Sequence, residues 1–231
     1  MFSLAARCWA LFRDLWAPPP AKDFSGRTIP VRTIADIRLK QRELVLTFDD
    51  GPLPGCTERI LAILEDIGVK ATFLMVGAPA RANPATVRMV AQKGHTIGSH
   101  TENHADLRVA EPALARAEID AGRDSVAAPL QSSHYRATPL FRFPYLADTP
   151  LLRDELAGRG IVVLDVDINI GDDSDLSPQE LHRQALRRIV RRGSGIVLMH
   201  DIHARTAAML PNLLADLKRK GFTIVHLIAA A

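Results

Sequence analysis

Apolar residues follow two alternating periods along the chain from residue 43 onward. Short apolar runs with β-branched residues are typical of buried strands, and between most of them apolar residues recur every three or four positions, as on one face of a helix. The predicted strands are residues 44–48, 71–76, 95–99, 140–143, 161–167, 195–199 and 223–227. The predicted helices are residues 57–67, 85–93, 112–126, 150–159, 178–192 and 206–220.

This alternation of strands and helices predicts an α/β fold with βαβ units, a parallel sheet and right-handed crossovers. Neither an internal repeat nor a linker interrupts residues 43–231, so we expect a single domain there. The pattern leaves two architectures open, an open doubly wound sheet and a closed barrel with seven or eight strands, because strand order cannot be read from the sequence.

Residues 1–42 are predicted to be a separate N-terminal segment. Apolar residues dominate residues 1–17, but Arg7, Arg13 and Asp14 interrupt them, so no apolar run is long enough for a signal-peptide core or a bilayer span. We expect an amphipathic helix, lying on a membrane or on the domain, or a relic of an export signal, followed by a proline-rich spacer and a lead-in. The periplasm or cell envelope is the favoured location, and the cytoplasm is the alternative.

Bulk composition narrows the choice of partners. Hydrophobic residues make up 47% of the 231 residues and charged residues 24%, which is ordinary for a globular protein. A net charge of only +3 and an aromatic content of 5% argue against nucleic acid as a partner. The two cysteines, Cys8 and Cys56, cannot build a disulfide framework or a cysteine-based zinc site, so any metal must be held by oxygen and imidazole ligands.

Ionisable residues stand at the C-terminal ends of five predicted strands, whereas the N-terminal ends of these strands are bland. In parallel α/β folds, functional sites are built at the C-terminal edge of the sheet. The residues are Asp49 and Asp50, His100, Arg142, Asp165 and Asp167, and His200 and Asp201. We therefore expect them to belong to one site.

The stretch HTENH places His100 and His104 four positions apart, close enough on one face of a helical turn to share a metal. The metalloprotease pattern requires a glutamate directly after the first histidine, where this chain has Thr101, so that class is excluded. Two imidazoles and one carboxylate suit catalytic zinc or another divalent ion of the first transition row. Because adjacent residues of an extended chain point to opposite sides, we expect one of Asp49 and Asp50 to bind the metal and the other to act on the attacking water.

Four motifs, TFDDGP, HTENH, RFPY and LMHD, follow one another in an order and at a spacing that resemble the polysaccharide deacetylases. These are metal-dependent carbohydrate esterases of family 4, built on the NodB homology domain, and the resemblance covers about residues 43–227. It implies a single-domain, distorted parallel (β/α) barrel with seven or eight strands. It also implies that Asp50, His100 and His104 bind the metal and that Asp49 is the general base.

The resemblance further implies a role for four residues of the later motifs. Arg142 would pair with the base and fix its orientation, and the backbone N–H of Tyr145 would help to hold the oxyanion. Leu198 would form the apolar wall for the acetyl methyl group, and His200 would be the general acid that protonates the departing amine.

The fourth motif of the family is altered in this chain. The family has an aspartate followed three residues later by Asp-Trp, whereas this chain has Asp167 followed by Ile170 and Gly171. We expect Asp167 to orient His200 and to raise its pKa, because a nearby opposite charge favours the imidazolium, with Asp165 as the reserve candidate. The missing tryptophan affects the fit of the substrate rather than the chemistry.

Together these features predict a metal-dependent hydrolase that releases acetate from an N-acetylated amino-sugar polymer or oligomer. The candidate substrates are a chitooligosaccharide, peptidoglycan or an exopolysaccharide, and zinc is the expected metal, with cobalt or nickel as alternatives. An amidohydrolase acting on a non-sugar C–N bond and a catalytically inactive glycan-binding domain are the competing hypotheses. We expect no obligate protein partner, and peripheral membrane contact, if any, through residues 1–17.

Overall fold

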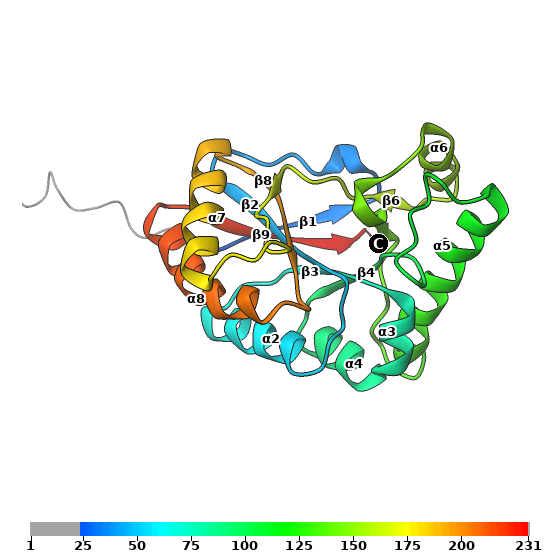
Figure 1. Ribbon diagram of the computed structural model, residues 1–231, viewed down its shortest axis with the longest axis horizontal. Helices are drawn as coiled ribbons and strands as arrows, with labels where there is room; N and C mark the ends of the chain where they lie inside the picture. Colours follow the sequence, from blue (N-terminus) through cyan, green and yellow to red (C-terminus); the bar gives the residue numbers. More distant parts are fainter. Residues whose placement is uncertain (1–23, 231) are drawn as a thin grey trace, which may run out of the picture.

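The computed structural model describes residues 24–230, and nine strands in this part form one sheet in which all pairs run parallel (Figure 1). The α/β class and the parallel sheet are thereby confirmed. The strands are β1 (Ser25–Val31), β2 (Glu43–Asp49), β3 (Thr72–Met75), β4 (Thr96–Ser99), β5 (Leu140–Phe141), β6 (Val162–Val163), β7 (Ile168–Asn169), β8 (Gly195–His200) and β9 (Thr223–Ala229).

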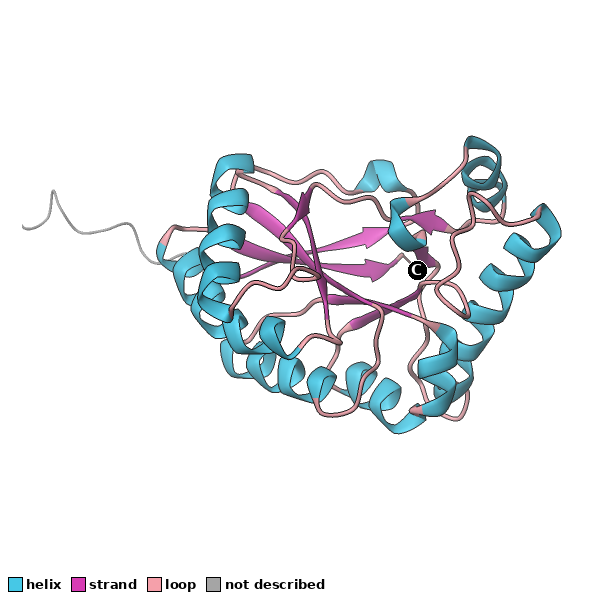
Figure 2. Cartoon of the chain, in the orientation of Figure 1, coloured by secondary structure: helices cyan, strands magenta, loops and turns pink. Residues whose placement is uncertain are grey.

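Helices wrap around the sheet, as Figure 2 shows. They are α2 (Cys56–Ile67), α3 (Gly77–Ala82), α4 (Pro84–Gln92), α5 (Pro112–Ala127), α6 (Pro150–Gly158), α7 (Pro178–Arg192) and α8 (Ala204–Arg219), with the short 3-10 turns η1 (Ile34–Asp36), η2 (Ala128–Leu130) and η3 (Pro144–Leu146). Each of the six predicted helices is present, and α7 shows why: Ser177 caps its start, and Gly193 ends it in a left-handed conformation with a φ of 85°.

The sheet branches at β2. Its order is β1-β9-β2-β3-β4-β5-β6, while β8 pairs with β2 and β7 pairs with β8. The predicted strand 161–167 is divided, because the N–H of Leu164 donates to Phe141 of β5, whereas the N–H of Asp167 donates to Ile196 of β8. This segment therefore passes from β5 to β8 without a continuous run of strand hydrogen bonds. Within residues 24–230, β6 and β7 do not pair with each other, so no pairing between them closes the barrel.

Side-chain alternation along β2 divides the core into two layers. Leu46 and Phe48 pack in the larger core, which the helices α2, α4, α7 and α8 cover. Val45 packs in a smaller core with residues of β1, β3, β5, β8 and β9. Thr47 and Asp49 share the Val45 face by the period of two, so this inner layer leads to the C-terminal edge of the sheet, where the site lies.

The strand β1 lies in the stretch that we assigned to the lead-in, and it pairs with β9 from Ser25↔Ile224 to Val31↔Ala229. Residues 1–23 lie outside the described part, and with them the predicted amphipathic helix, the proline-rich spacer and the membrane contact of residues 1–17. None of the described helices is both long and apolar enough to cross a membrane.

Candidate active site

The ends of β2 and β8 bring two predicted site residues directly together. Asp49 and His200 are register partners in this pair of strands. Asp49 is buried at the end of β2, with a relative exposure of 2%, whereas Asp50 is the first residue after the strand and is partly exposed. Two of the predicted site residues are therefore neighbours at the C-terminal ends of β2 and β8, as the sequence analysis predicted.

Asp50 has a φ of 76°, in the left-handed region that non-glycine residues seldom adopt. This conformation breaks the alternation of the strand, so both carboxylates face the same histidine. The Nε2 atom of His100 lies 3.5 Å from Oδ1 of Asp50 and 3.9 Å from Oδ2 of Asp49. The two aspartates thus share one site and differ in their surroundings rather than in the side to which they point.

Asp50, His100 and His104 form a group whose potential ligand atoms all lie within 4.8 Å of one another. The Nε2 atom of His104 lies 3.2 Å from Oδ1 of Asp50, and this buried oxygen has no hydrogen-bond partner among the described residues. The Nδ1–H of His100 donates to the carbonyl of Arg142 at 2.8 Å, which leaves Nε2 free to bind a metal. A carboxylate oxygen without a partner, facing two imidazoles, fits a divalent cation.

The pKa values of this group favour metal-binding protonation states. Burial of the His100 ring lowers its pKa, so the imidazole is neutral at physiological pH. Burial alone would raise the pKa of Asp50, but the adjacent His104 ring and the positive charge of His200 lower it. An ionised carboxylate and a neutral imidazole are the forms that bind a metal.

A buried ion pair fixes the neighbouring carboxylate. Nη1 of Arg142 donates to Oδ1 of Asp49 at 2.7 Å and to Oγ1 of Thr47 at 2.8 Å, and the side chains of both charged residues are at most 3% exposed. The remaining donors of the guanidinium reach the carbonyls of Leu164 and Asp165. The Arg142 guanidinium therefore orients Asp49, and the other carboxylate oxygen of Asp49, Oδ2, faces His100.

His200 is held by a carboxylate that the sequence analysis did not select. Its Nδ1–H donates to Oδ1 of Asp172 at 2.8 Å, while Oδ2 of Asp172 accepts from the N–H of His200 and from Oγ1 of Thr206. Burial lowers the pKa of His200, but the hydrogen bond and charge of Asp172, together with Asp50 and Asp49, raise it to about 9. The other ring nitrogen, Nε2, faces the site, 4.0 Å from Oδ2 of Asp50.

The prediction that Asp167 orients His200 is wrong. Asp167 accepts from the N–H of Ile196 at 3.0 Å and pairs with Arg192 at 2.7 Å, at the start of β8 rather than at its end. Asp167 precedes β7, which runs parallel to β8, so it lies one strand length below His200. Asp172 is fully buried and takes the position that we had assigned to Asp167.

The reserve candidate, Asp165, does not contact His200 either, and it pairs with Arg153 of α6. After β7 the chain turns at Gly171, which has a φ of 77°, and this turn directs the next residue beneath the end of β8. The period-two argument missed Asp172 because that residue lies beyond the end of the strand. The acidic run Asp172-Asp173 was the only signal for it in the sequence.

Tyr145 and Leu198 belong to two different elements, η3 and β8. The ring of Tyr145, which is 66% exposed, contacts the ring of His104 edge to face at a centroid distance of 4.6 Å. Leu198 is buried on β8 and shares the face of His200, two positions before it. An aromatic ring and an apolar side chain thus border the site.

Asp201 was expected only as one of the ionisable residues at the strand ends. In the structure its carboxylate is buried. Thr57 of α2 donates to its Oδ2 at 2.6 Å, and a Cβ at Gly51 would collide with both carboxylate oxygens. Burial raises the pKa of Asp201 to about 7. Asp201 therefore packs beneath the turn that carries Asp50.

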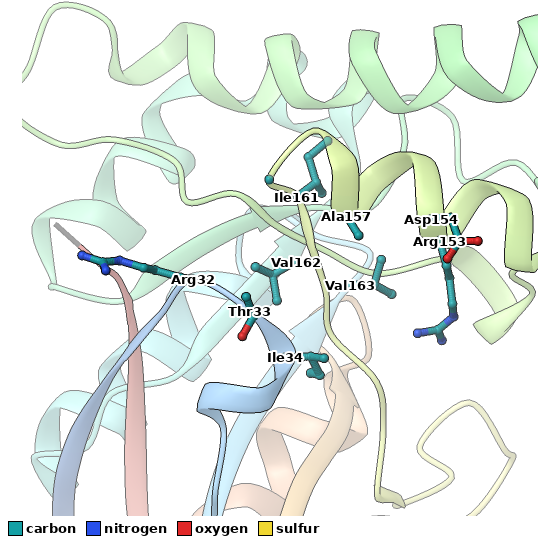
Figure 3. Close-up of a pocket in the computed structure, with 10 residues that line it drawn as sticks. Arg32, Thr33, Ile34, Arg153, Asp154, Ala157, Ile161, Val162 and Val163 are labelled. Atoms are coloured by element: carbon teal, nitrogen blue, oxygen red, sulfur yellow. The ribbon is translucent and has the colours of Figure 1, made fainter.

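A cavity of about 410 Å³ opens beside the metal-binding group and is lined by Asp50 and His104, with residues of α3 and Ile202. Another cavity, of about 270 Å³, lies between η1, α6 and β6, where Ile34 and Val163 face each other across it (Figure 3). None of the predicted site residues lines this second cavity, so the chemistry belongs to the first one.

Comparison with known proteins decides the family. The family model described as polysaccharide deacetylase matches residues 36–163, more than half of the chain. The chain belongs to the polysaccharide deacetylase family. The matched residues carry Asp49, Asp50, His100 and His104, as well as Arg142, so the family assignment and the geometry of the site concern the same part of the molecule.

Three relatives illustrate the extent of this polysaccharide deacetylase domain. A chitin deacetylase from Colletotrichum lindemuthianum is 33% identical over 218 residues, which cover 89% of this chain and 86% of the relative. A peptidoglycan-N-acetylglucosamine deacetylase from Listeria monocytogenes is 30% identical over 184 residues, which cover 80% of this chain but only 38% of the relative. The structure of a peptidoglycan deacetylase from Bdellovibrio bacteriovorus superposes with a TM-score of 0.77 at 33% identity, covering 91% of this chain and 58% of that chain.

These relatives indicate a hydrolase of the class that acts on N-acetylated sugar polymers. The predicted family and its keywords, a hydrolase with a NodB homology domain, are confirmed.

Proposed function

We propose that the protein is a metal-dependent N-deacetylase that hydrolyses the acetamido group of an amino-sugar polymer or oligomer and releases acetate. One observation carries this proposal: the group of Asp50, His100 and His104 lies between two oriented side chains, Asp49 held by Arg142 and His200 held by Asp172. A base and an acid on either side of a cation site are the parts that amide hydrolysis needs.

In this proposal zinc is the resident ion, held by Asp50, His100 and His104, with cobalt or nickel as alternatives. The three side chains occupy part of a coordination shell and leave positions open, as in catalytic rather than structural zinc sites. When bound, the ion supplies Lewis acidity, polarising the amide carbonyl and lowering the pKa of water.

Asp49 is the proposed general base, which takes the proton of the attacking water. Its Oδ1 is bound by Arg142, so only Oδ2 is available to accept that proton. A base fixed in one orientation needs no rearrangement at the moment of attack.

His200 is the proposed general acid, which donates a proton to the departing nitrogen. Its pKa of about 9 means that the ring is protonated at neutral pH, and Nε2 is the nitrogen that carries the transferable proton toward the site. Asp172 stabilises this imidazolium and sets its orientation through Nδ1. Protonation is required because an amine anion is too basic to leave unaided.

The oxyanion and the acetyl group have proposed binding positions in two further residues. Tyr145 lies beside His104, with a ring centroid distance of 4.6 Å, and we assign its backbone N–H to the developing oxyanion. Leu198 is assigned to the acetyl methyl group, because it is apolar and shares the face of His200. No tryptophan lies among the described residues, so this wall of the pocket differs from the family pattern.

The substrate class follows from the relatives and the shape of the site. Their names specify chitin and peptidoglycan, two polymers that carry N-acetylglucosamine, and a cavity of about 410 Å³ lies beside Asp50 to receive a sugar. Both polymers lie outside the cytoplasmic membrane, which supports the periplasm or cell envelope as the proposed location.

Acetate release tests the proposal directly. N-acetylglucosamine oligomers and peptidoglycan fragments are offered to chelated protein, zinc-restored protein and zinc-restored D49N. We expect release only from the zinc-restored wild type. Zinc binding without release from either glycan, but with release from a small non-sugar acetamide, would replace the substrate class. Zinc binding without release from any amide would favour a glycan-binding domain instead.

A further inference from the structure

The segment from Thr101 to His104 connects the two metal-binding histidines in a backbone conformation of high energy. Thr101 has a φ of 64° and His104 a φ of 57°. A left-handed conformation is strained at a non-glycine residue, and it persists where the surroundings hold it. The surroundings here are two helices, α3 and α5, one on each side of the segment.

On the α3 side, backbone groups hold the first half of the segment. The N–H of Gly77 donates to the carbonyl of Thr101, and the N–H of Ala78 donates to the carbonyl of Glu102, each at 2.9 Å. The Glu102 side chain is buried against Gly77, where a Cβ would collide with it, and Arg81 of α3 pairs with its other oxygen. This side fixes Thr101 and Glu102 but makes no hydrogen bond to the residue that precedes His104.

On the α5 side, one residue binds the second half of the segment. The carbonyl of Glu118 accepts from the N–H of Glu102 at 2.9 Å. Its carboxylate accepts from the N–H of Asn103 at 2.9 Å and from Nδ2 of Asn103 at 2.7 Å. Two of these three hydrogen bonds belong to a side chain, so they depend on which residue occupies position 118.

Glu118 binds the N–H of the Glu102–Asn103 peptide, whose carbonyl accepts from Ala78 on the α3 side. This peptide lies one residue before His104, so its rotation displaces that histidine. Asn103 is exposed, and among the described residues its hydrogen bonds go to Glu118 alone. Because a metal site tolerates displacements of only tenths of an ångström, a residue that fixes this peptide also fixes the distance between the two imidazoles.

We propose that Glu118 is a positioning residue, which holds Asn103, the residue before His104, so that both imidazole Nε2 atoms face Asp50 and bind the ion together. Glu118 touches neither the ion nor the substrate, and it acts through Asn103. The inference rests on the proposed metal site and adds to it a determinant of affinity in a helix that contributes no ligand. Partners behind the ligands of a metal site are worth 10- to 100-fold in affinity.

The test is a zinc affinity, measured on the full chain by competition with a chromophoric chelator, together with the visible absorption spectrum of the cobalt-loaded protein. The variants are Glu118→Ala, which removes both side-chain acceptors, and Glu118→Gln, which keeps one oxygen. Asp120→Asn is the matched control, since it removes one carboxylate from the same helix, where Asp120 pairs with Arg159 and not with the segment.

We expect E118A to bind zinc about 10- to 100-fold more weakly than the wild type and to alter the cobalt spectrum, E118Q to fall between, and D120N to match the wild type. Equal zinc affinities and equal cobalt spectra for E118A and the wild type would overturn the positioning role while leaving the metal site intact. A wild type that binds no zinc would overturn both the metal site and the inference.

A second variant guards against loss of folding in E118A. Asn103→Ala removes the Nδ2 donor from an exposed side chain and keeps the backbone bond to Glu118. We expect a smaller loss, of several-fold in zinc affinity, with an unchanged melting temperature of the metal-free chain. The proposal would be overturned if N103A bound zinc as tightly as the wild type while its melting temperature fell as much as that of E118A. Glu118 would then be a structural contact only.

Discussion

Two pairs of histidines lie at opposite ends of β4, and their neighbours give them different chemistry. His100 follows the strand and faces Asp50 together with His104, so that two imidazole nitrogens lie within 3.5 Å of one carboxylate oxygen. His95 precedes the strand, and His226 lies beside it, bonded through Nε2 to Oγ1 of Thr96 at 3.0 Å. The two pairs are alike in residue type and partly buried, and only the first has a carboxylate.

The neighbours of the second pair are cations. Burial is the main cause that lowers the pKa of His95 to about 3, and the charges of Lys70 and Lys93 lower it further. Burial and then Lys70 lower the pKa of His226 in the same way. Nδ1 of His95 accepts from the N–H of Ala71, so the ring is used in the backbone of the fold. The two pairs therefore differ in the charge that faces the imidazoles, and only the pair with a carboxylate offers the set of ligands that suits a divalent cation.

The largest effect on zinc affinity is expected when the carboxylate that distinguishes the first histidine pair from the second is removed. In Asp50→Ala, zinc affinity should fall by more than about 100-fold, beyond the loss caused by a residue behind the ligands, and acetate release should fall to background. Isothermal titration with zinc measures it.

Asp49→Asn sharpens the comparison by separating binding from catalysis. We expect kcat to fall by about 10²- to 10⁴-fold, because the amide cannot take the proton of water, while zinc content stays at the wild-type value. Unfolding by urea should show a loss of about 1–3 kcal/mol, since Arg142 keeps a neutral oxygen in place of a charged partner. Loss of zinc in this variant would mean that Asp49 is itself a ligand.

Asp172→Asn tests a third histidine, His200, whose neighbour raises rather than lowers its pKa. The acid is active when protonated, and the raised pKa of about 9 keeps it protonated up to that pH. Removing the charge of Asp172 should move the alkaline limb of the profile of kcat/KM to lower pH by about one unit or more, with activity near pH 6 less affected. The same profile for Asp167→Asn should match the wild type, and a shift there instead would reverse our correction.

The smallest effect concerns His95 and appears in stability alone. Its pKa in the folded chain, about 3, lies below the ordinary value of 6.5, so the unfolded chain binds a proton first and stability falls as the pH drops below 6.5. This group should account for a loss of about 2 kcal/mol between pH 7 and pH 5. Urea unfolding of His95→Gln at both pH values checks it, and a loss in the variant as large as in the wild type would assign the acid sensitivity elsewhere.

The sequence pattern predicted those parts of the fold that are long and periodic. All six predicted helices are present, whereas α3 was missed because GAPARA is too short and too rich in alanine, glycine and proline to show a helical period. Strand β1 was missed because only two of its seven residues, Ile29 and Val31, are buried, and they give no clear alternation. Division of the predicted strand 161–167 depends on which neighbour each half bonds, a property of the folded chain.

Within the site, the residues that end strands could be predicted and the residues that support them could not. Asp49, His100 and Arg142 follow directly from the end of a buried run, because the strand fixes where they emerge. Asp172 and Glu118 lie after a turn and on a helix, and only the tertiary fold brings them to their partners. The left-handed conformation of Asp50 likewise could not be predicted, because no periodic pattern in the sequence indicates it.

The hydrogen bonds that orient Asp49 and His200 are complete without an ion, since Arg142 and Asp172 are themselves protein groups. Under the proposed metal dependence, the ion would add its chemistry to side chains that the protein itself has oriented. The working fraction of the protein in a cell would then follow the supply of free metal rather than its own synthesis, and a change in that supply would act on every copy alike.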